Sequence, residues 1–193
     1  MESGHHSDSQ DLSLCGRVRQ ATGEYVFKCY QCGKCSAGCP LGMEMDYPPS
    51  QIIRMIQLGF PGLEEKALSS RTIWLCLTCE TCQARCPKEV ELPKIMDFLR
   101  QESLRRGLAH PDAKKIISFH RAFLDSVEYT GRLFEMGLIV DYKIRNPGRA
   151  FQDVLVAPKM FLKGKLKPMP HLLKGRSNIG KIFQKAWQKE KNK

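Results

Sequence analysis

A twelve-residue pattern of cysteines occurs twice and limits what this chain can fold into. The first copy runs from Cys29 to Pro40 and the second from Cys76 to Pro87, and both read C-x2-C-x2-C-x3-C-P. Eight of the nine cysteines lie in these two copies. Four thiolates at this spacing can wrap a metal centre without long loops, so we expect the chain to fold around two such centres.

The spacing and the following proline are those of the bacterial ferredoxin run, in which three close cysteines hold one [4Fe-4S] cluster and the fourth reaches the other. The sequence therefore predicts two [4Fe-4S] clusters with crossed ligands. The first cysteine set is Cys29, Cys32, Cys35 and Cys86, and the second cysteine set is Cys39, Cys76, Cys79 and Cys82. A four-cysteine zinc site in each copy is the alternative, but zinc sites usually combine two separated C-x2-C pairs and need neither the third cysteine nor the proline.

Other residues in the two copies bear on the clusters. Gly33 and Gly38 are expected to supply backbone angles that a tightly wound loop requires. Lys34 lies inside the first copy, and Arg85 and Lys88 flank Cys86 in the second. Each of these cations could act on a nearby cluster by raising its reduction potential, or could contact an acidic partner. Most charged residues on a protein surface do neither.

Length, hydropathy and cysteine spacing narrow the class of protein. A chain of 193 residues fits one domain, or a small domain with an extension. No stretch approaches the length of about 18 apolar residues that a membrane span needs, and the N-terminus has no apolar signal segment. Regular, close cysteine spacing indicates metal binding in a reducing compartment. We therefore predict a cytoplasmic protein without a transmembrane segment, which a membrane-bound partner could hold at the inner surface.

Helical periodicity dominates and strand-like alternation is scarce, so the fold class is predicted to be mainly α. One helix is expected to have Ser50 as its N-cap and to stop at Gly59 and Pro61. Further helices are expected over about 63–69, from Pro93 to about 106, after Asp112, over 127–136 and over 179–187.

Four segments are expected: 1–22 as a flexible N-terminal segment, 23–110 as an α-helical ferredoxin domain with two clusters, 111–153 as a C-terminal helical region, and 154–193 as a basic partner-docking extension. Cys15, in the first segment, is either a spare ligand or redox thiol, or a plain thiol on an apolar patch, which we favour. Trp74 is expected to pack over a cluster and not to transfer electrons.

Charge is distributed unevenly along the chain. The net charge is +11; residues 1–110 carry 13 basic and 13 acidic side chains, whereas residues 111–193 carry 18 and 7. Residues 154–193 contain eleven basic residues and one acidic residue, interleaved with apolar residues. This pattern favours docking of the extension on an acidic partner subunit. Binding to nucleic acid, binding to an anionic membrane surface and a merely solvated extension are the alternatives.

The stretch from about residue 25 to 140 resembles the C subunit of heterodisulfide reductase. The likeness rests on KCYQCGKC (28–35), GCP (38–40), QIIRMIQLG (51–59), WLCLTCETC (74–82), RCP (85–87), Phe119-His120, Gly131-Arg132 and Glu135. Twin cysteine motifs alone are shared with the iron–sulfur subunits of succinate dehydrogenase and glycolate oxidase, and the connecting residues make the match more specific. The extension after about 150 is the part least covered.

This resemblance implies an α-helical ferredoxin fold in a soluble complex with A and B subunits. There a flavin-containing A subunit feeds electrons through this chain to the catalytic B subunit, which reduces the CoM-S-S-CoB heterodisulfide. The chain lacks both CCG-type cysteine motifs and a flavin-binding glycine fingerprint. We therefore expect a non-catalytic electron-transfer subunit of an oxidoreductase complex, with no catalytic residue of its own.

Two other functions are kept as alternatives. The first is the iron–sulfur subunit of another soluble or membrane-associated dehydrogenase or disulfide reductase complex. The second is a nucleic-acid-binding protein with structural clusters, which we disfavour. The family also occurs in organisms without methanogenesis, so the final disulfide substrate is left open.

Overall fold

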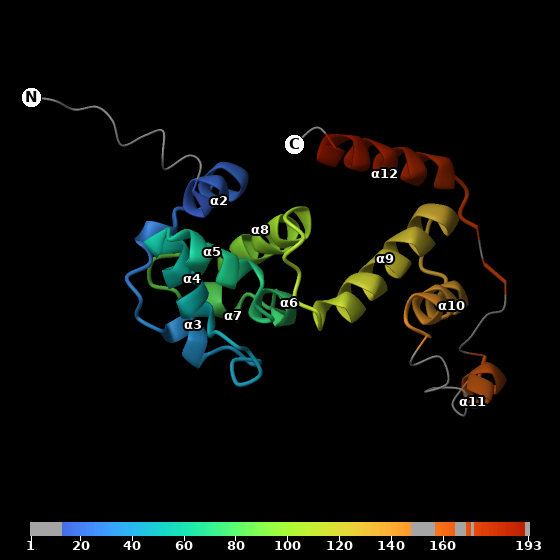
Figure 1. The fold of residues 1–193 in the computed structure, drawn as a ribbon. Coiled ribbons are helices and arrows are strands. Elements are labelled where there is room, and N and C mark those ends of the chain that lie inside the picture. Colours follow the sequence, from blue (N-terminus) through green and yellow to red (C-terminus); the bar gives the residue numbers. More distant parts are fainter. Residues whose placement is uncertain (1–12, 148–156, 165–168, 171, 192–193) are drawn as a thin grey trace, which may run out of the picture. The chain divides into compact units, whose positions relative to one another are not determined.

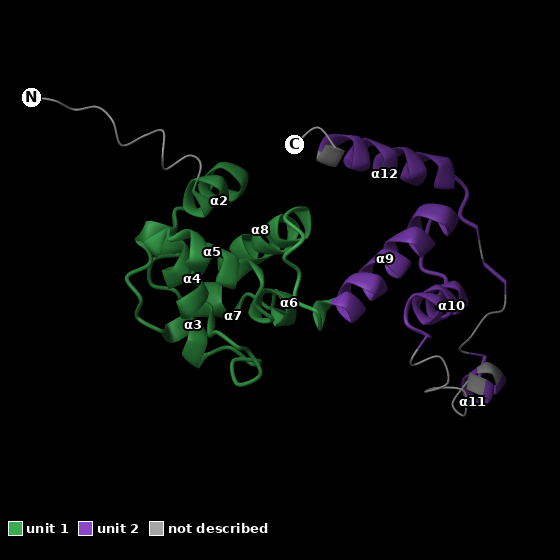
Figure 2. Cartoon of the chain, in the orientation of Figure 1, with its two compact units in different colours: residues 1–113 green, residues 114–193 purple. Residues whose placement is uncertain are grey.

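All regular elements in the described part of the chain are helices, which confirms the predicted mainly α fold. The computed structural model describes residues 13–147, 157–164, 169–170 and 172–191. The chain divides into two compact units, residues 1–113 and 114–193 (Figure 2). Within the described residues, no helix is both long enough and apolar enough to cross a bilayer.

Unit 1 holds both cysteine motifs among short helices (Figure 1). Its elements are α2 (Leu14–Thr22), the 3-10 helix η1 (Val26–Lys28), α3 (Lys34–Ala37), α4 (Pro49–Leu58), α5 (Pro61–Leu68), α6 (Thr72–Leu75), α7 (Thr81–Ala84) and α8 (Leu92–Arg105). Two of them, α3 and α7, lie inside the cysteine motifs, and the segment between the motifs contains α4, α5 and α6.

Helices α4 and α8 supply much of the core of unit 1. Their apolar residues recur at helical spacing, and the fully buried ones include Ile52, Ile53, Ile56, Ile95 and Leu99. Burying one such side chain stabilises a fold by about 1.5–3 kcal/mol. These two helices therefore form the support on which the cysteine loops rest.

The bounds of α4 differ from the expected ones. Pro48 and not Ser50 is the N-cap, and a proline takes the first helical position, where its missing N–H costs no hydrogen bond. The hydroxyl of Ser50 lies 2.7 Å from the hydroxyl of Ser36, so Ser50 connects α4 to the first motif. The helix ends at Gly59, as expected, with a left-handed φ of +66°. Pro61 does not stop this helix but begins the next one, α5.

Part of the N-terminal segment that was expected to be flexible is helical. Helix α2 buries the side chains of Leu14 and Val18 completely, and Ser13 caps it by accepting the backbone N–H of Gly16. The expectation was therefore wrong for residues 14–22, where apolar residues one helical turn apart were the available signal. Residues 1–12 lie outside the described residues.

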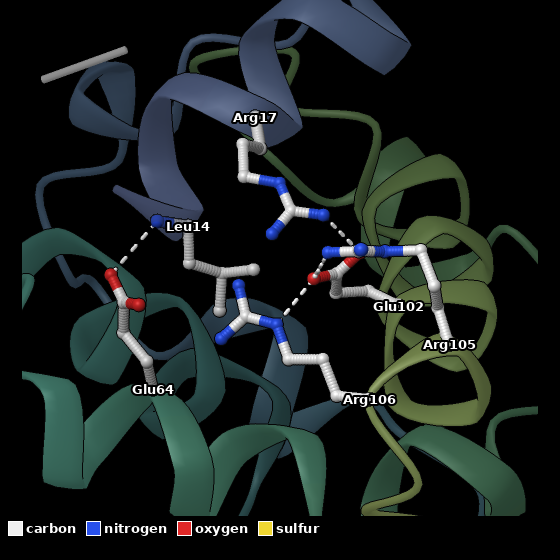
Figure 3. A network of polar contacts seen from close by, with 6 residues as sticks. All are labelled: Leu14, Arg17, Glu64, Glu102, Arg105 and Arg106. Carbon is white, nitrogen blue, oxygen red and sulfur yellow. Dashed lines mark hydrogen bonds and ion pairs between the residues drawn. The ribbon is translucent and has the colours of Figure 1, made fainter. Parts of the chain in front are cut away.

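Two buried carboxylates hold α2 against the rest of unit 1 (Figure 3). Glu64 accepts the backbone N–H of Leu14 at 2.9 Å. Glu102 of α8 pairs with Arg17 of α2 and also with Arg105 and Arg106 of its own helix. Glu64 thus satisfies a backbone donor of α2, and Glu102 pairs with a charged side chain of α2. Because buried polar groups need such partners, α2 is an integral part of unit 1.

Unit 2 contains α9 (Ala113–Thr130), α10 (Glu135–Arg145), α11 (Ala157–Leu162) and α12 (Arg176–Lys191). The helix expected over 127–136 was wrong, because α9 ends at Thr130 and Gly131 has a left-handed φ of +84°. The hydroxyl of Ser126 accepts the backbone N–H of Phe134 at 2.9 Å and so fixes the turn into α10. The glycine was the available signal for this break.

The basic extension packs against the end of α9. The backbone N–H of Leu173 donates to the carbonyl oxygen of Thr130 at 3.2 Å. A Cβ atom on Gly131 would lie 3.1 Å from Cβ of Leu173, so the absence of a side chain permits this approach. The helix expected over 179–187 lies within α12, which is longer at both ends. The extension thus contains a helix, α12, and contacts the end of α9 just before that helix begins.

Candidate metal centre

The two cysteine motifs adopt the same local conformation. Gln31 and Thr78 hold the same place in the two motifs, and both have a left-handed φ, +63° and +51° respectively. The next equivalent pair, Gly33 and Glu80, has values of +76° and +60°. Such angles cost a non-glycine residue about 1–3 kcal/mol and concentrate at functional sites. Their repetition therefore indicates a loop shape that the cysteines require.

Gly38 serves a different purpose from the one expected. Its φ of −100° is open to any residue, so the expected need for an unusual backbone angle was wrong at this position. A Cβ atom there would instead lie 2.4 Å from Nη1 of Arg85. Arg85 holds the place in the second motif that Gly38 holds in the first. The two motifs therefore meet where these equivalent residues face each other.

All four cysteines of the second set line one cavity. Cys39 comes from the first motif, whereas Cys76, Cys79 and Cys82 come from the second. The rest of the wall is mostly apolar and consists of Pro40, Leu41, Met45, Pro49, Leu75, Leu77, Thr81, Leu92, Pro93 and Met96. The structure thus brings together thiols from two motifs that α4, α5 and α6 separate in the sequence.

The Tyr30 phenol lies near cysteines of the first set from both motifs. Desolvation raises the pKa of the Tyr30 phenol, and the thiols of Cys32, Cys86 and Cys29 raise it further. The phenol therefore lies near cysteines of both motifs. Burial raises the pKa of the Cys35 thiol, Ser36 opposes this rise, and Cys29 adds to it.

The thiol pKa values in the second set reflect burial and the closeness of other cysteines. Burial raises the pKa of Cys82 to about 11, and the neighbouring Cys76 and Cys35 add to the rise. Burial also raises the pKa of Cys76, to which Cys39 contributes. A low dielectric and adjacent negative charge both disfavour the thiolate. A bound metal centre would remove this penalty, because its positive charge stabilises the thiolates that ligate it.

The placement of the thiols in the second set suits a cluster. All four line the wall of one cavity. A [4Fe-4S] cluster takes one cysteine at each iron, so ligands distributed in this way suit it.

Polar residues outside the motifs hold the cysteine loops, and the sequence pattern did not identify them. Gln57 of α4 donates to the carbonyl oxygens of Val26 at 2.9 Å and Cys29 at 2.7 Å. Asp46 accepts backbone N–H groups at the start of α6, just before the second motif. On sequence alone, both look like ordinary solvent-facing residues, so no periodicity marked them.

Cys15 and Trp74 both lie at least partly inside unit 1. Burial and then Glu64 raise the pKa of the half-buried Cys15 thiol, against the opposing effect of Arg19. A raised pKa favours a plain thiol, because the thiolate is the reactive and ligating form. Trp74 is buried, and its indole N–H has no acceptor among the described residues. Its packing over a cluster stays a prediction.

Comparison with known families supports the metal centre. A family model described as "4Fe-4S dicluster domain" matches residues 25–90. That range contains both cysteine motifs in full and ends before α8. The match therefore covers the cysteine loops and the helices between them.

Several proteins of methanogenic archaea are similar to this chain. The C subunit of the "H(2):CoB-CoM heterodisulfide,ferredoxin reductase" of Methanothermobacter marburgensis is 34% identical over 109 residues, 56% of this chain and 57% of the relative. An iron–sulfur C subunit of the "CoB--CoM heterodisulfide reductase" of Methanocaldococcus jannaschii is 31% identical over 128 residues, 65% of each chain. The C subunit of the "Ferredoxin:CoB-CoM heterodisulfide reductase" of Methanosarcina mazei is 32% identical over 100 residues, 52% of this chain and 60% of the relative. The chain thus spans between half and two thirds of the length of these relatives.

Proposed function

We propose that this chain carries two [4Fe-4S] clusters with crossed ligands. Residues 25–90 match the 4Fe-4S dicluster domain model, and the chain is similar to C subunits of heterodisulfide reductases. Cys29, Cys32, Cys35 and Cys86 hold one cluster, and Cys39, Cys76, Cys79 and Cys82 hold the other. The observation that carries this assignment is the cavity lined by Cys39 together with three cysteines of the second motif.

The chain acts as a non-catalytic electron-transfer subunit. When bound, each cluster supplies one-electron transfer. The chain's own residues hold the clusters, shape their surroundings and exclude water from the apolar cavity of the second set. Because every iron has a cysteine ligand in this assignment, none is left open for a substrate. The disulfide chemistry then belongs to another subunit.

The partners are a flavin-containing A-type subunit that donates electrons and a catalytic B-type subunit that reduces the CoM-S-S-CoB heterodisulfide. Support comes from the relatives, whose names describe them as C subunits of such reductases. We place the complex in the cytoplasm and assign the basic extension to contact with a partner subunit. No nucleic acid is needed in this assignment.

Metal analysis of anaerobically purified chain tests the proposal. We expect about eight irons per chain and an absorption band that bleaches on addition of dithionite. Replacing Cys39 or Cys86 by serine should lower the iron content and destabilise both halves of unit 1, because each of these residues connects the two motifs. Zinc in place of iron would refute the cluster assignment.

An anaerobic pull-down with the full chain as bait tests the partners. Recovery of a flavoprotein together with a protein that contains CCG-type motifs would support the heterodisulfide reductase assignment. Recovery of a membrane-associated dehydrogenase would instead place the same two clusters in a different oxidoreductase complex.

A further inference from the structure

A chain of amide groups leads from α4 to a sulfur atom of the first cysteine set. The side-chain nitrogen of Gln57 faces two carbonyl oxygens, of Val26 and Cys29, so it must be the donor end of that amide. Its oxygen therefore faces Gln31, and accepts from Gln31 Nε2 at 3.2 Å. The same Nε2 lies 3.5 Å from Sγ of Cys29. The network thus orients an N–H of Gln31 toward the sulfur, because the carbonyl partners of Gln57 fix which end of each amide is the donor.

Further groups that favour negative charge surround the first set. The backbone N–H of Val90 lies 3.4 Å from Sγ of Cys86. Lys28 and Lys34 are exposed and stand next to Cys29 and between Cys32 and Cys35, respectively. Donated hydrogen bonds and positive charges both stabilise added negative charge on a cluster.

The second set has different surroundings. The residue equivalent to Gln31 is Thr78, whose hydroxyl donates to the carbonyl oxygen of Leu77 at 2.7 Å and not to a sulfur. The hydroxyl of Thr81 lies 3.4 Å from Sγ of Cys79. Among the described residues, the other hydrogen bonds to sulfurs of this set come from backbone N–H groups, such as those of Thr78, Thr81 and Gln83, and not from a side-chain amide. The sulfur of Cys39 faces the thioether of Met45, 4.0 Å away.

The cation beside Cys76 is itself paired with an acid, whereas the Arg85 guanidinium lies beside Gly38, next to Cys39. Arg100 is the cation near Cys76, and it is paired with Asp97 at 3.0 Å. The exposed residue between Cys79 and Thr81 is an acid, Glu80, where the first motif has a glycine. The cavity wall is otherwise mostly apolar. Reduction adds an electron without a proton, and an apolar wall disfavours the additional negative charge.

We propose that the cluster of the first set has the higher reduction potential and that the amide of Gln31 contributes to this difference. Electrons then enter at the cluster of the second set, from a one-electron donor such as a reduced flavin, and leave from the cluster of the first set. Gln31 is a positioning residue that acts through Cys29, and Gln57 positions Gln31. This inference rests on the proposed function, because it requires both clusters.

Redox titration of the full, cluster-loaded chain, followed by electron paramagnetic resonance, tests the order. The wild type should reduce in two separate steps. Gln31→Met keeps the size and unbranched shape of the side chain but removes the N–H, and should lower the higher potential while leaving the lower one unchanged. Thr78→Val is the matched control at the equivalent position and should shift neither step. No shift in Gln31→Met, or a shift of the lower step, would overturn the proposal.

A second measurement needs no variant. In chain labelled with 15N at glutamine side chains, pulsed paramagnetic resonance should detect a 15N coupling to the cluster that is reduced first. The absence of a coupling to the cluster that is reduced first would overturn the inference. Iron content is measured beforehand in each sample. A wild type with fewer than two clusters refutes the proposed function itself, whereas two clusters with equal or reversed potentials refute only the electron order.

Discussion

The carboxylate of Asp46 fastens the segment after the first motif to Thr72, just before the second motif. Its Oδ1 accepts the backbone N–H of Thr72 at 2.9 Å and the hydroxyl at 2.6 Å, and its Oδ2 accepts the backbone N–H of Arg71 at 2.9 Å. Thr72 begins α6, which leads into Cys76. Burial alone would raise the pKa of Asp46, but these hydrogen bonds lower it. The fold therefore favours the ionised form.

Asp46→Asn should loosen this connection, because one acceptor oxygen becomes an NH2 donor that faces other donors. We expect the free energy of unfolding at pH 7 to fall by about 1–3 kcal/mol, measured by anaerobic urea denaturation followed by circular dichroism. Glu44→Gln removes a charge from an exposed residue of the same segment and should change stability by less than about 0.5 kcal/mol. Equal effects of the two substitutions would contradict the assigned role.

Glu102 should make a larger contribution to stability than an exposed acid on the same helix. It is 3% exposed and binds three arginines, Arg17, Arg105 and Arg106 (Figure 3). We expect Glu102→Gln to lower the free energy of unfolding at pH 7 by about 2–4 kcal/mol. Asp97→Asn, which breaks a pair whose carboxylate is half exposed, should cost less than about 1 kcal/mol. Similar losses in both variants would show that α2 does not depend on this network.

The same carboxylate predicts a pH dependence. Burial would raise the pKa of Glu102, but the hydrogen bonds and charges of the arginines outweigh it and lower the pKa to about 2, from an ordinary value of 4.5. A depressed folded-state pKa means that the stabilisation is complete above the ordinary pKa and is lost as the pH falls toward the folded-state pKa. The stability difference between wild type and Glu102→Gln should therefore stay constant from neutral pH down to about 5 and shrink only in stronger acid. A difference that shrinks at neutral pH would contradict the assigned pKa direction.

Gly38 and Arg85 should be energetically coupled, because a Cβ atom on residue 38 would lie where the guanidinium now is. Gly38→Ala is expected to lower the free energy of unfolding by about 1–3 kcal/mol, and much less when Arg85→Ala is also present. Gly62→Ala is the control, since a Cβ atom there meets no atom within 4 Å. Additive effects in the double variant would show that the two residues do not share this space.

What could be predicted from the sequence depended on whether the signal was local. Cysteine spacing and helical periodicity are local, so the helical class and the match to a 4Fe-4S dicluster domain were predictable. The glycine at position 131 and the spacing of Leu14 and Val18 are local signals too, for a helix end and a helix respectively. The amide chain from Gln57 to Gln31 was not predictable, because the two residues are 26 positions apart and become partners only after α4 packs on the first motif.

Removal of residues 155–193 should separate cluster binding from assembly. All eight motif cysteines lie in unit 1, so the truncated chain is expected to keep about eight irons. Its recovery of partner subunits in an anaerobic pull-down should fall sharply, because α12 carries exposed lysines beside an exposed Ile182 and Trp187. A full-length variant with Lys181, Lys185 and Lys189 changed to glutamate reverses the charge of these three positions in α12 without shortening the chain. Its recovery of an acidic partner in the pull-down should also fall.

Loss of iron from the truncated chain would contradict the division into units. Undiminished recovery of partners would contradict docking through the extension.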